Sequence, residues 1–150
     1  MKILATLMCA MFAMSNLSAL SQDSWIAGLE GTWVVDGARG SDVGVSVSIN
    51  REAGALVLKT TFNGREIVTR YDLTGADATN TSLGSGPQAI YRTRIEERKL
   101  VTQIWTGKAE GAPQNIETRY LESPDVMVIE LARAPGGPVF NRTQLRRKAR

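Results

Sequence analysis

The residues that could carry chemistry in this chain are few, and the missing types narrow the reactions most. The 150-residue sequence contains no histidine, and its one cysteine, Cys9, lies in an apolar run near the N-terminus. Ser-His-Asp and Cys-His catalysis, histidine-ligated zinc and histidine-ligated haem are therefore excluded. Asp72, Asp77 and Asp125 fall in separate predicted turns without calcium-loop spacing, so we expect no metal site and no cofactor.

Paired carboxylates are the remaining acid–base candidates. Glu96 and Glu97 are adjacent, but neighbours on a strand point to opposite faces of a sheet, which favours a solvated turn. The glycine-rich stretch 84–87 has no following helix that could present amides to a phosphate, so it is expected to be a loop. These features favour a protein that is not an enzyme. A histidine-free isomerase or cyclase that uses a carboxylate and a tyrosine remains an alternative.

A threonine recurs at the centre of five predicted strands, on the same face as Leu, Ile, Phe or Tyr. If these faces point inward, a belt of hydroxyls among apolar side chains forms a pocket with a few orienting hydrogen bonds. The expected ligand-binding residues are Thr60, Thr69, Thr93, Thr102, Thr118, Tyr71, Tyr91 and Tyr120. The alternative is that Thr is simply a favoured strand residue and that some of these registers are inverted.

The expected charge of this interior bears on the ligand. Apart from Arg142, near the base, no Lys or Arg is expected inside. A neutral lipid, a quinone or an aromatic compound is therefore favoured over a fatty acid held by a buried guanidinium. The sequence thus predicts a small apolar or weakly polar ligand.

The elements that must position these side chains are strands, because alternation of period two runs from Trp33 onward between turn residues. Asn63-Gly64 is a strong hairpin signal, since both residues accept the positive φ of a type I′ turn. Strands are expected at 32–36, 43–50, 55–62, 66–73, 79–83, 89–96, 100–106, 115–121, 126–132 and 139–145. An all-β, antiparallel up-and-down meander of 8–10 strands is predicted, closed as a barrel because closure removes exposed edges.

The N-terminus has the pattern of a signal peptide. Lys2 precedes an apolar run from Ile3 to Met14, and small or polar residues follow up to Ser21. We expect residues 1–21 to be removed, which predicts a periplasmic or secreted protein without a transmembrane segment in the mature chain. Residues 22–150 then form a single β-barrel domain with a basic C-terminal tail.

Charge gives little reason to expect a polyanionic partner. Lys and Arg number 18 against 15 Asp and Glu, a net charge of +3. Basic residues gather only at the end of the chain, at Arg142, Arg146, Arg147, Lys148 and Arg150. A solvated strand end is favoured, with docking to an anionic surface as the alternative. Nucleic acid is not expected, because aromatic and basic residues do not interleave on one face.

A short helix before the first strand supplies the one family resemblance. Asp23 or Ser24 can cap it, and Trp25, Ile26 and Leu29 fall on one side, where they could plug a barrel end. Gly31-Thr32-Trp33 after such a helix, followed by a meander, resembles the calycin barrels, meaning lipocalins, fatty-acid-binding proteins and avidins. The likeness is greatest to small exported bacterial lipocalin-like proteins. It implies that Trp33 closes the barrel base and that an arginine of the last strand, Arg142 by position, packs over it.

Two functions of different classes follow from these expectations. The first is binding of a small apolar or weakly polar ligand inside the barrel, which the resemblance to calycins and the threonine belt both favour. The second is a protein-interaction or inhibitor module, which would have a filled barrel and an exposed apolar patch.

Overall fold

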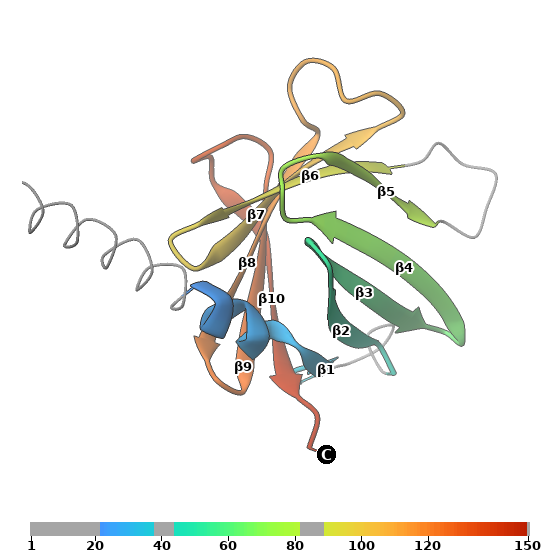
Figure 1. Cartoon of the computed structure of the whole chain (residues 1–150), viewed down its shortest axis with the longest axis vertical. Helices are drawn as coiled ribbons and strands as arrows, with labels where there is room; N and C mark the ends of the chain where they lie inside the picture. Colours follow the sequence, from blue (N-terminus) through green and yellow to red (C-terminus); the bar gives the residue numbers. More distant parts are fainter. Residues whose placement is uncertain (1–21, 38–43, 82–88, 150) are drawn as a thin grey trace, which may run out of the picture.

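The chain folds as one short helix followed by ten strands (Figure 1). The computed structural model describes residues 22–37, 44–81 and 89–149, with residues 79–81 described by their backbone. The helix covers residues 22–29. The strands are β1 (Gly31–Val35), β2 (Ser46–Glu52), β3 (Ala55–Phe62), β4 (Arg65–Asp72), β5 (Asp77–Thr81), β6 (Ala89–Glu96), β7 (Lys99–Thr106), β8 (Asn115–Ser123), β9 (Val126–Ala132) and β10 (Val139–Arg147).

The strands form one antiparallel meander that closes into a barrel. Each strand pairs with its neighbours in the sequence, and β1 pairs with β10 to complete the ring. The hairpin between β3 and β4 turns through Asn63 and Gly64, at φ of 49° and 71°, as a type I′ turn requires. The predicted all-β barrel with a short N-terminal helix is therefore confirmed.

The helix covers the lower end of the barrel, beside β1 and β9 (Figure 1). Ile26 and Leu29 are buried in the core, and the half-buried Trp25 packs against it. Asp23 at the start of the helix forms an ion pair of 2.8 Å with Arg51 of β2. The apolar side of the helix thus packs into the base of the barrel and keeps water from the core there.

Trp33 is the centre of this closed base. Its side chain is fully buried, and its indole Nε1 donates a hydrogen bond of 2.9 Å to the carbonyl of Leu29. The guanidinium of Arg147 lies 4.2 Å from the ring centroid, and Arg147 pairs with Trp33 across the β1–β10 ladder. Gly31 has φ of 128°, and a Cβ atom there would lie 2.7 Å from Nη1 of Arg147. Glycine is needed at this position for both reasons.

The expectation that Arg142 packs over Trp33 is wrong. Arg142 is exposed and pairs with Glu122 at 3.0 Å and with Glu130 at 3.4 Å. The reason is register: β10 continues to Arg147, and Arg142, at an odd spacing from it, faces the other side of the sheet.

The basic residues at the end of the chain are largely engaged within it. Arg146 forms an ion pair of 2.7 Å with Asp36, and Arg142 and Arg147 have the partners given above. Arg150, the predicted signal peptide at residues 1–21 and the glycine-rich stretch 84–87 lie outside the described residues. Within the described ranges, no helix is long and apolar enough to cross a membrane.

Candidate functional site

The inward side chains of the barrel are buried at the base and more exposed toward the other end. On β3 the inward residues Leu56 and Leu58 are buried, whereas Phe62 at the hairpin tip is 38% exposed. On β4 the order runs from Tyr71, which is 3% exposed, to Ile67, which is 36% exposed. The inward face therefore emerges into solvent as it nears the β3–β4 hairpin.

On three other strands, too, the inward side chains become less buried away from the base. Inward residues toward the base are buried and the next ones toward the mouth are half-buried: Thr93 then Tyr91 on β6, Thr102 then Ile104 on β7, and Leu145 then Thr143 on β10. We call the end of the barrel where the inward side chains are more exposed the mouth. We call the level of the buried polar residues Thr93, Thr102 and Arg119 the floor.

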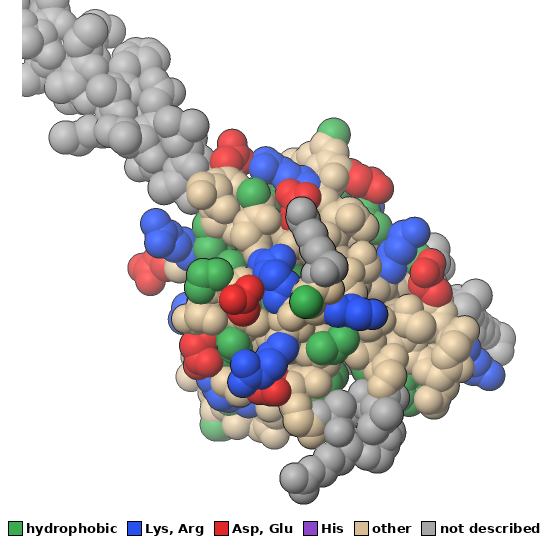
Figure 2. All heavy atoms as spheres, turned by 90° about the horizontal axis from the view of Figure 1, so that it is seen from below, with side chains coloured by type: hydrophobic (Ala, Val, Ile, Leu, Met, Phe, Trp, Pro, Cys, Tyr) green, Lys and Arg blue, Asp and Glu red, His purple; other side chains and the backbone are tan. Residues whose placement is uncertain are grey.

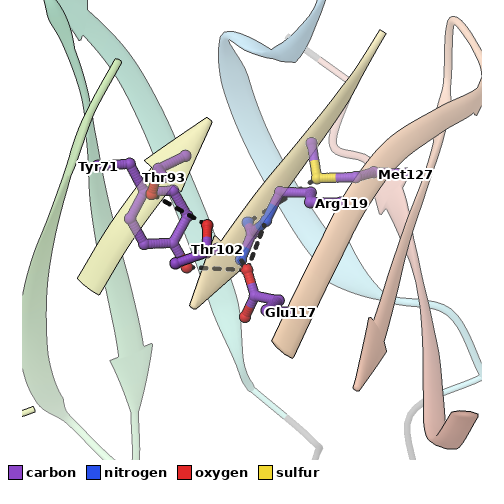
Figure 3. A network of polar contacts seen from close by, with 6 residues as sticks. All are labelled: Tyr71, Thr93, Thr102, Glu117, Arg119 and Met127. Atoms are coloured by element: carbon purple, nitrogen blue, oxygen red, sulfur yellow. Dashed lines mark hydrogen bonds and ion pairs between the residues drawn. The ribbon is translucent and has the colours of Figure 1, made fainter. Parts of the chain in front are cut away.

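A cluster of three polar residues lies at the floor of the barrel (Figure 3). Arg119 of β8 forms an ion pair of 3.0 Å with Glu117, and its Nε lies 3.3 Å from the same carboxylate oxygen. The hydroxyl of Tyr71 donates a hydrogen bond of 2.8 Å to that oxygen. Arg119 also stacks 5.6 Å from the centroid of the Tyr71 ring, and its Nη1 contacts the sulfur of Met127. We call Tyr71, Glu117 and Arg119 the floor cluster.

The floor cluster is electrically neutral, although it contains a buried cation. Burial alone would lower the pKa of Arg119, but the charge of Glu117, the interaction with Tyr71 and the hydrogen bonds to both together outweigh it, so the pKa lies above its ordinary value. Burial and the negative charge of Glu117 together raise the pKa of Tyr71 well above its ordinary value. Arg119 therefore stays charged beside Glu117, and the phenol of Tyr71 stays protonated as a donor.

Two further contacts extend the polar floor. The hydroxyls of Thr93 and Thr102, which face each other across β6 and β7, are 3.0 Å apart in a buried hydrogen bond. The ring of Tyr91 lies 5.8 Å from that of Tyr71 at a tilt of 38°. Burial, followed by the charge of Glu117, raises the pKa of Tyr91 as well. Phenol and hydroxyl groups therefore face the interior beside the ion pair.

The structure places most of the predicted site residues on the inward face. The six inward residues are Thr60, Thr69, Thr93, Thr102, Tyr71 and Tyr91. Thr118 and Tyr120 are not among them, because β8 directs Glu117, Arg119 and Leu121 inward instead. Tyr120 bonds to Glu130 on the outer face at 3.1 Å, and Lys99 lies 5.3 Å from the centroid of its ring. The predicted inward register of β8 is therefore wrong.

Glu117 and Arg119, the charged residues of the floor cluster, are not among the site residues predicted from the sequence. Glu117 and Arg119 are two residues apart on one strand and so share a face, which makes an ion pair between them sterically simple. That spacing was the available signal. The apolar residues Ile116 and Tyr120 outweighed it, because hydrophobic side chains are ordinarily assigned to the inside. The expectation of an interior without Lys or Arg is wrong for this reason.

The floor cluster is better suited to hydrogen bonding than to acid–base chemistry. The carboxylate oxygen of Glu117 that faces this cluster already accepts hydrogen bonds from a guanidinium and a phenol. In the described part of the chain, no group of three or more His, Cys, Asp or Glu side chains could hold a metal ion. The arrangement places one polar patch among inward-facing apolar and hydroxyl side chains.

The comparisons with known proteins bear on the fold. No protein-family model and no curated protein matches the sequence. Among solved structures, the REP1-NXSQ fatty acid transporter superposes with a TM-score of 0.59 at 16% identity, covering 83% of this chain and 98% of its own. A point mutant of that transporter gives a TM-score of 0.58 at 16% identity, covering 82% of this chain and 99% of its own. The chain is similar to these proteins in architecture, a closed antiparallel barrel that has ten strands in this chain.

Proposed function

We propose that this protein binds a small, uncharged, apolar or weakly polar ligand inside its barrel. The observation that carries the proposal is the gradient of burial: the inward residues go from buried at the base to exposed at Phe62 and Ile67. A ligand that enters at the mouth replaces water over apolar surface, which is favourable by about 25 cal/mol per Å². It then meets the floor cluster, whose hydrogen bonds can fix its orientation.

The neutrality of the floor cluster favours an uncharged ligand. Arg119 could attract a carboxylate, but Glu117 lies 3.0 Å away and would repel the same carboxylate. A ligand hydroxyl can donate to Glu117, and a ligand carbonyl can accept from a tyrosine hydroxyl. An alcohol, a phenol or a ketone therefore fits this floor better than a fatty acid.

One further feature supports ligand binding, and another supports export. Two of the solved structures with this architecture are titled as a fatty acid transporter and its mutant, which is consistent with a ligand held in the barrel. The N-terminal sequence pattern supports export to the periplasm or the medium. Catalysis is not part of the proposal, because the buried carboxylate is already paired.

Native mass spectrometry of protein isolated from its own cell envelope tests the proposal, followed by thermal-shift titration with the molecules found. As defined probes we would use dodecanol and dodecanoate at equal concentrations. The wild-type protein should be stabilised more by dodecanol. In Glu117→Gln the charge of Arg119 is no longer balanced, so the preference should turn toward dodecanoate, whereas Glu122→Gln on the surface should keep it.

A second candidate function is an interaction module, which is favoured by exposed apolar side chains near the mouth. Phe62, Ile67, Val139 and Phe140 are 36–50% exposed. If no molecule co-purifies and neither a broad panel of neutral lipids nor aromatic compounds shifts the unfolding temperature, the ligand proposal is overturned. A protein retained by the wild type and lost with Phe62→Ser would then support the interaction module.

A further inference from the structure

A groove lies outside the barrel at its base, apart from the proposed interior ligand site. This groove of about 470 Å³ lies between the N-terminal helix, the β6–β7 turn and the β8–β9 turn. Its lining includes Trp25, Arg98, Lys99, Tyr120, Leu121 and Arg147. Tyr120 is on the outer face of β8, and Leu121 packs against the core, so these two residues separate the groove from the interior. We call it the base groove.

The floor of the base groove is apolar and partly covered. Trp25, Tyr120 and Leu121 are all half-buried. The helix lies close over this floor, since a Cβ atom on Gly28 would lie 3.0 Å from Cδ1 of Leu121. Aromatic rings with one accessible face offer contact area to an acyl or aryl group.

The rim of the groove is positively charged. Neither Arg98 nor Lys99 forms an ion pair with any residue that the structure describes, and Lys99 lies over the ring of Tyr120. Arg147 is already committed to the carbonyls of Gly28, Glu30 and Pro124. Glu97 is the one acidic residue in the lining. Two cations without a carboxylate partner therefore stand beside an apolar floor.

The turn that carries these cations is strained. Glu97 and Arg98 both have positive φ, 45° and 61°, in a turn with neither Gly nor Asn. The β3–β4 hairpin meets the same requirement with Asn63 and Gly64, residues that tolerate this conformation. Non-glycine residues with positive φ cost of order 1 kcal/mol each, and such strain gathers at functional sites. Here the strained turn places a guanidinium at the rim, which Gly could not supply.

We infer that the base groove binds a monomeric amphiphilic anion, meaning a short acyl or aryl group that carries a carboxylate or a phosphate. The apolar part lies on Trp25, Tyr120 and Leu121, and the anionic head pairs with Arg98 and Lys99. The volume is within the range of small-molecule sites, about 300–1,000 Å³. This inference is independent of the interior ligand, because the two sites share no residue of the floor cluster.

Seen from below, the base carries basic, acidic and hydrophobic side chains intermixed (Figure 2). A broad field of one sign would favour a flat anionic membrane over a single molecule. The mixed surface instead favours a ligand small enough to meet one pair of cations. The base groove is therefore expected to bind a free amphiphile rather than a lipid surface.

Titration of ¹⁵N-labelled protein with octyl phosphate, below its micelle concentration, tests the inference. Amide shifts should move at residues 24–28, 97–99 and 120–123, and calorimetry should give the affinity. Arg98→Gly and Lys99→Gln should each weaken binding by about tenfold or more. Because Gly accepts the backbone conformation of residue 98, Arg98→Gly should unfold at the same or a higher temperature, so lost binding cannot be attributed to misfolding.

Two controls make the result specific. Lys108→Gln removes an exposed positive charge at the other end of the barrel and should leave the affinity unchanged. Octanol, which lacks the anion, should bind the groove more weakly and be insensitive to Arg98→Gly. Unchanged affinity in both groove variants, shifts confined to the barrel interior, or binding to anionic vesicles without binding of the monomer would each overturn the inference.

Discussion

Arg147 lies over the indole of Trp33 at 4.2 Å and, from the same guanidinium, donates hydrogen bonds to three backbone carbonyls. Two of these carbonyls, those of Gly28 and Glu30, belong to the end of the helix and the residue after it. One side chain of the last strand therefore holds the helix, the first strand and the last strand together.

Replacement of Arg147 by Met should lower the free energy of unfolding by about 2–4 kcal/mol. The cation–π contact contributes about 0.5–2 kcal/mol, and the carbonyls that lose a charged donor account for the rest. Arg142→Met is the matched control, because its ion pairs are exposed, and it should cost less than about 1 kcal/mol. Urea unfolding monitored by tryptophan fluorescence measures both. Equal losses would mean that the stacking on Trp33 contributes little.

Gly31→Ala should destabilise the protein by about 2–3 kcal/mol, because its φ of 128° is unfavourable for a side chain and the Cβ would crowd Arg147. Gly64→Ala, at a positive φ with nothing within 4 Å of the new Cβ, should cost only about 1 kcal/mol. In the double variant Gly31→Ala/Arg147→Met, the combined loss should be smaller than the sum of the single losses. Strict additivity would show that Gly31 acts through its backbone conformation alone.

Glu117→Gln should cost about 3 kcal/mol of stability, because it leaves the charge of Arg119 buried without a counter-ion. Glu117→Gln combined with Arg119→Met should recover at least half of that loss, since the apolar replacement removes the stranded charge. The exposed pair of Arg142 and Glu122 provides the comparison, and Glu122→Gln should cost under about 1 kcal/mol. Chemical denaturation of the wild type and the three variants measures these free energies of unfolding. A double variant as unstable as the single one would contradict this view.

Stability should decline at high pH through Tyr71. Its pKa is raised in the folded state by burial and then by the charge of Glu117, whereas the unfolded chain ionises near the ordinary value of about 10. The unfolded state therefore loses its proton first, so stability from this group is complete below about pH 10 and is lost as the pH rises above it. Thermal unfolding between pH 7 and 11 should show this decline, and Tyr71→Phe should reduce it. An identical pH profile in Tyr71→Phe would assign the decline to other groups.

The fold could be predicted from local patterns because β-meanders are built from local information. Alternation marked each strand, and Asn63-Gly64 marked a hairpin that the structure contains. The inward register was predicted correctly where apolar residues share a face with the threonine, as at Thr93 and Thr102. The closure between β1 and β10 followed from the cost of leaving edges open.

The site could be predicted only in part, because its central contacts join distant strands. Glu117 is held by Tyr71, 46 residues earlier, and no pattern within β8 reports that partner. Tyr120 points outward because its neighbour Arg119 points inward. The predicted facing of every residue in β8 is therefore reversed by one ion pair that the sequence pattern did not indicate. The arginine over Trp33 was assigned to Arg142 because the last strand was expected to end at Leu145, two residues before Arg147.

The bond between Arg147 and the carbonyl of Glu30 spans 117 residues, and this separation has a kinetic consequence. The ring of strands cannot close until residue 147 has left the ribosome, so the meander must wait as an open sheet with β1 unpaired on one edge. Native contacts this far apart in sequence slow folding, because the chain entropy is lost before the contact is gained.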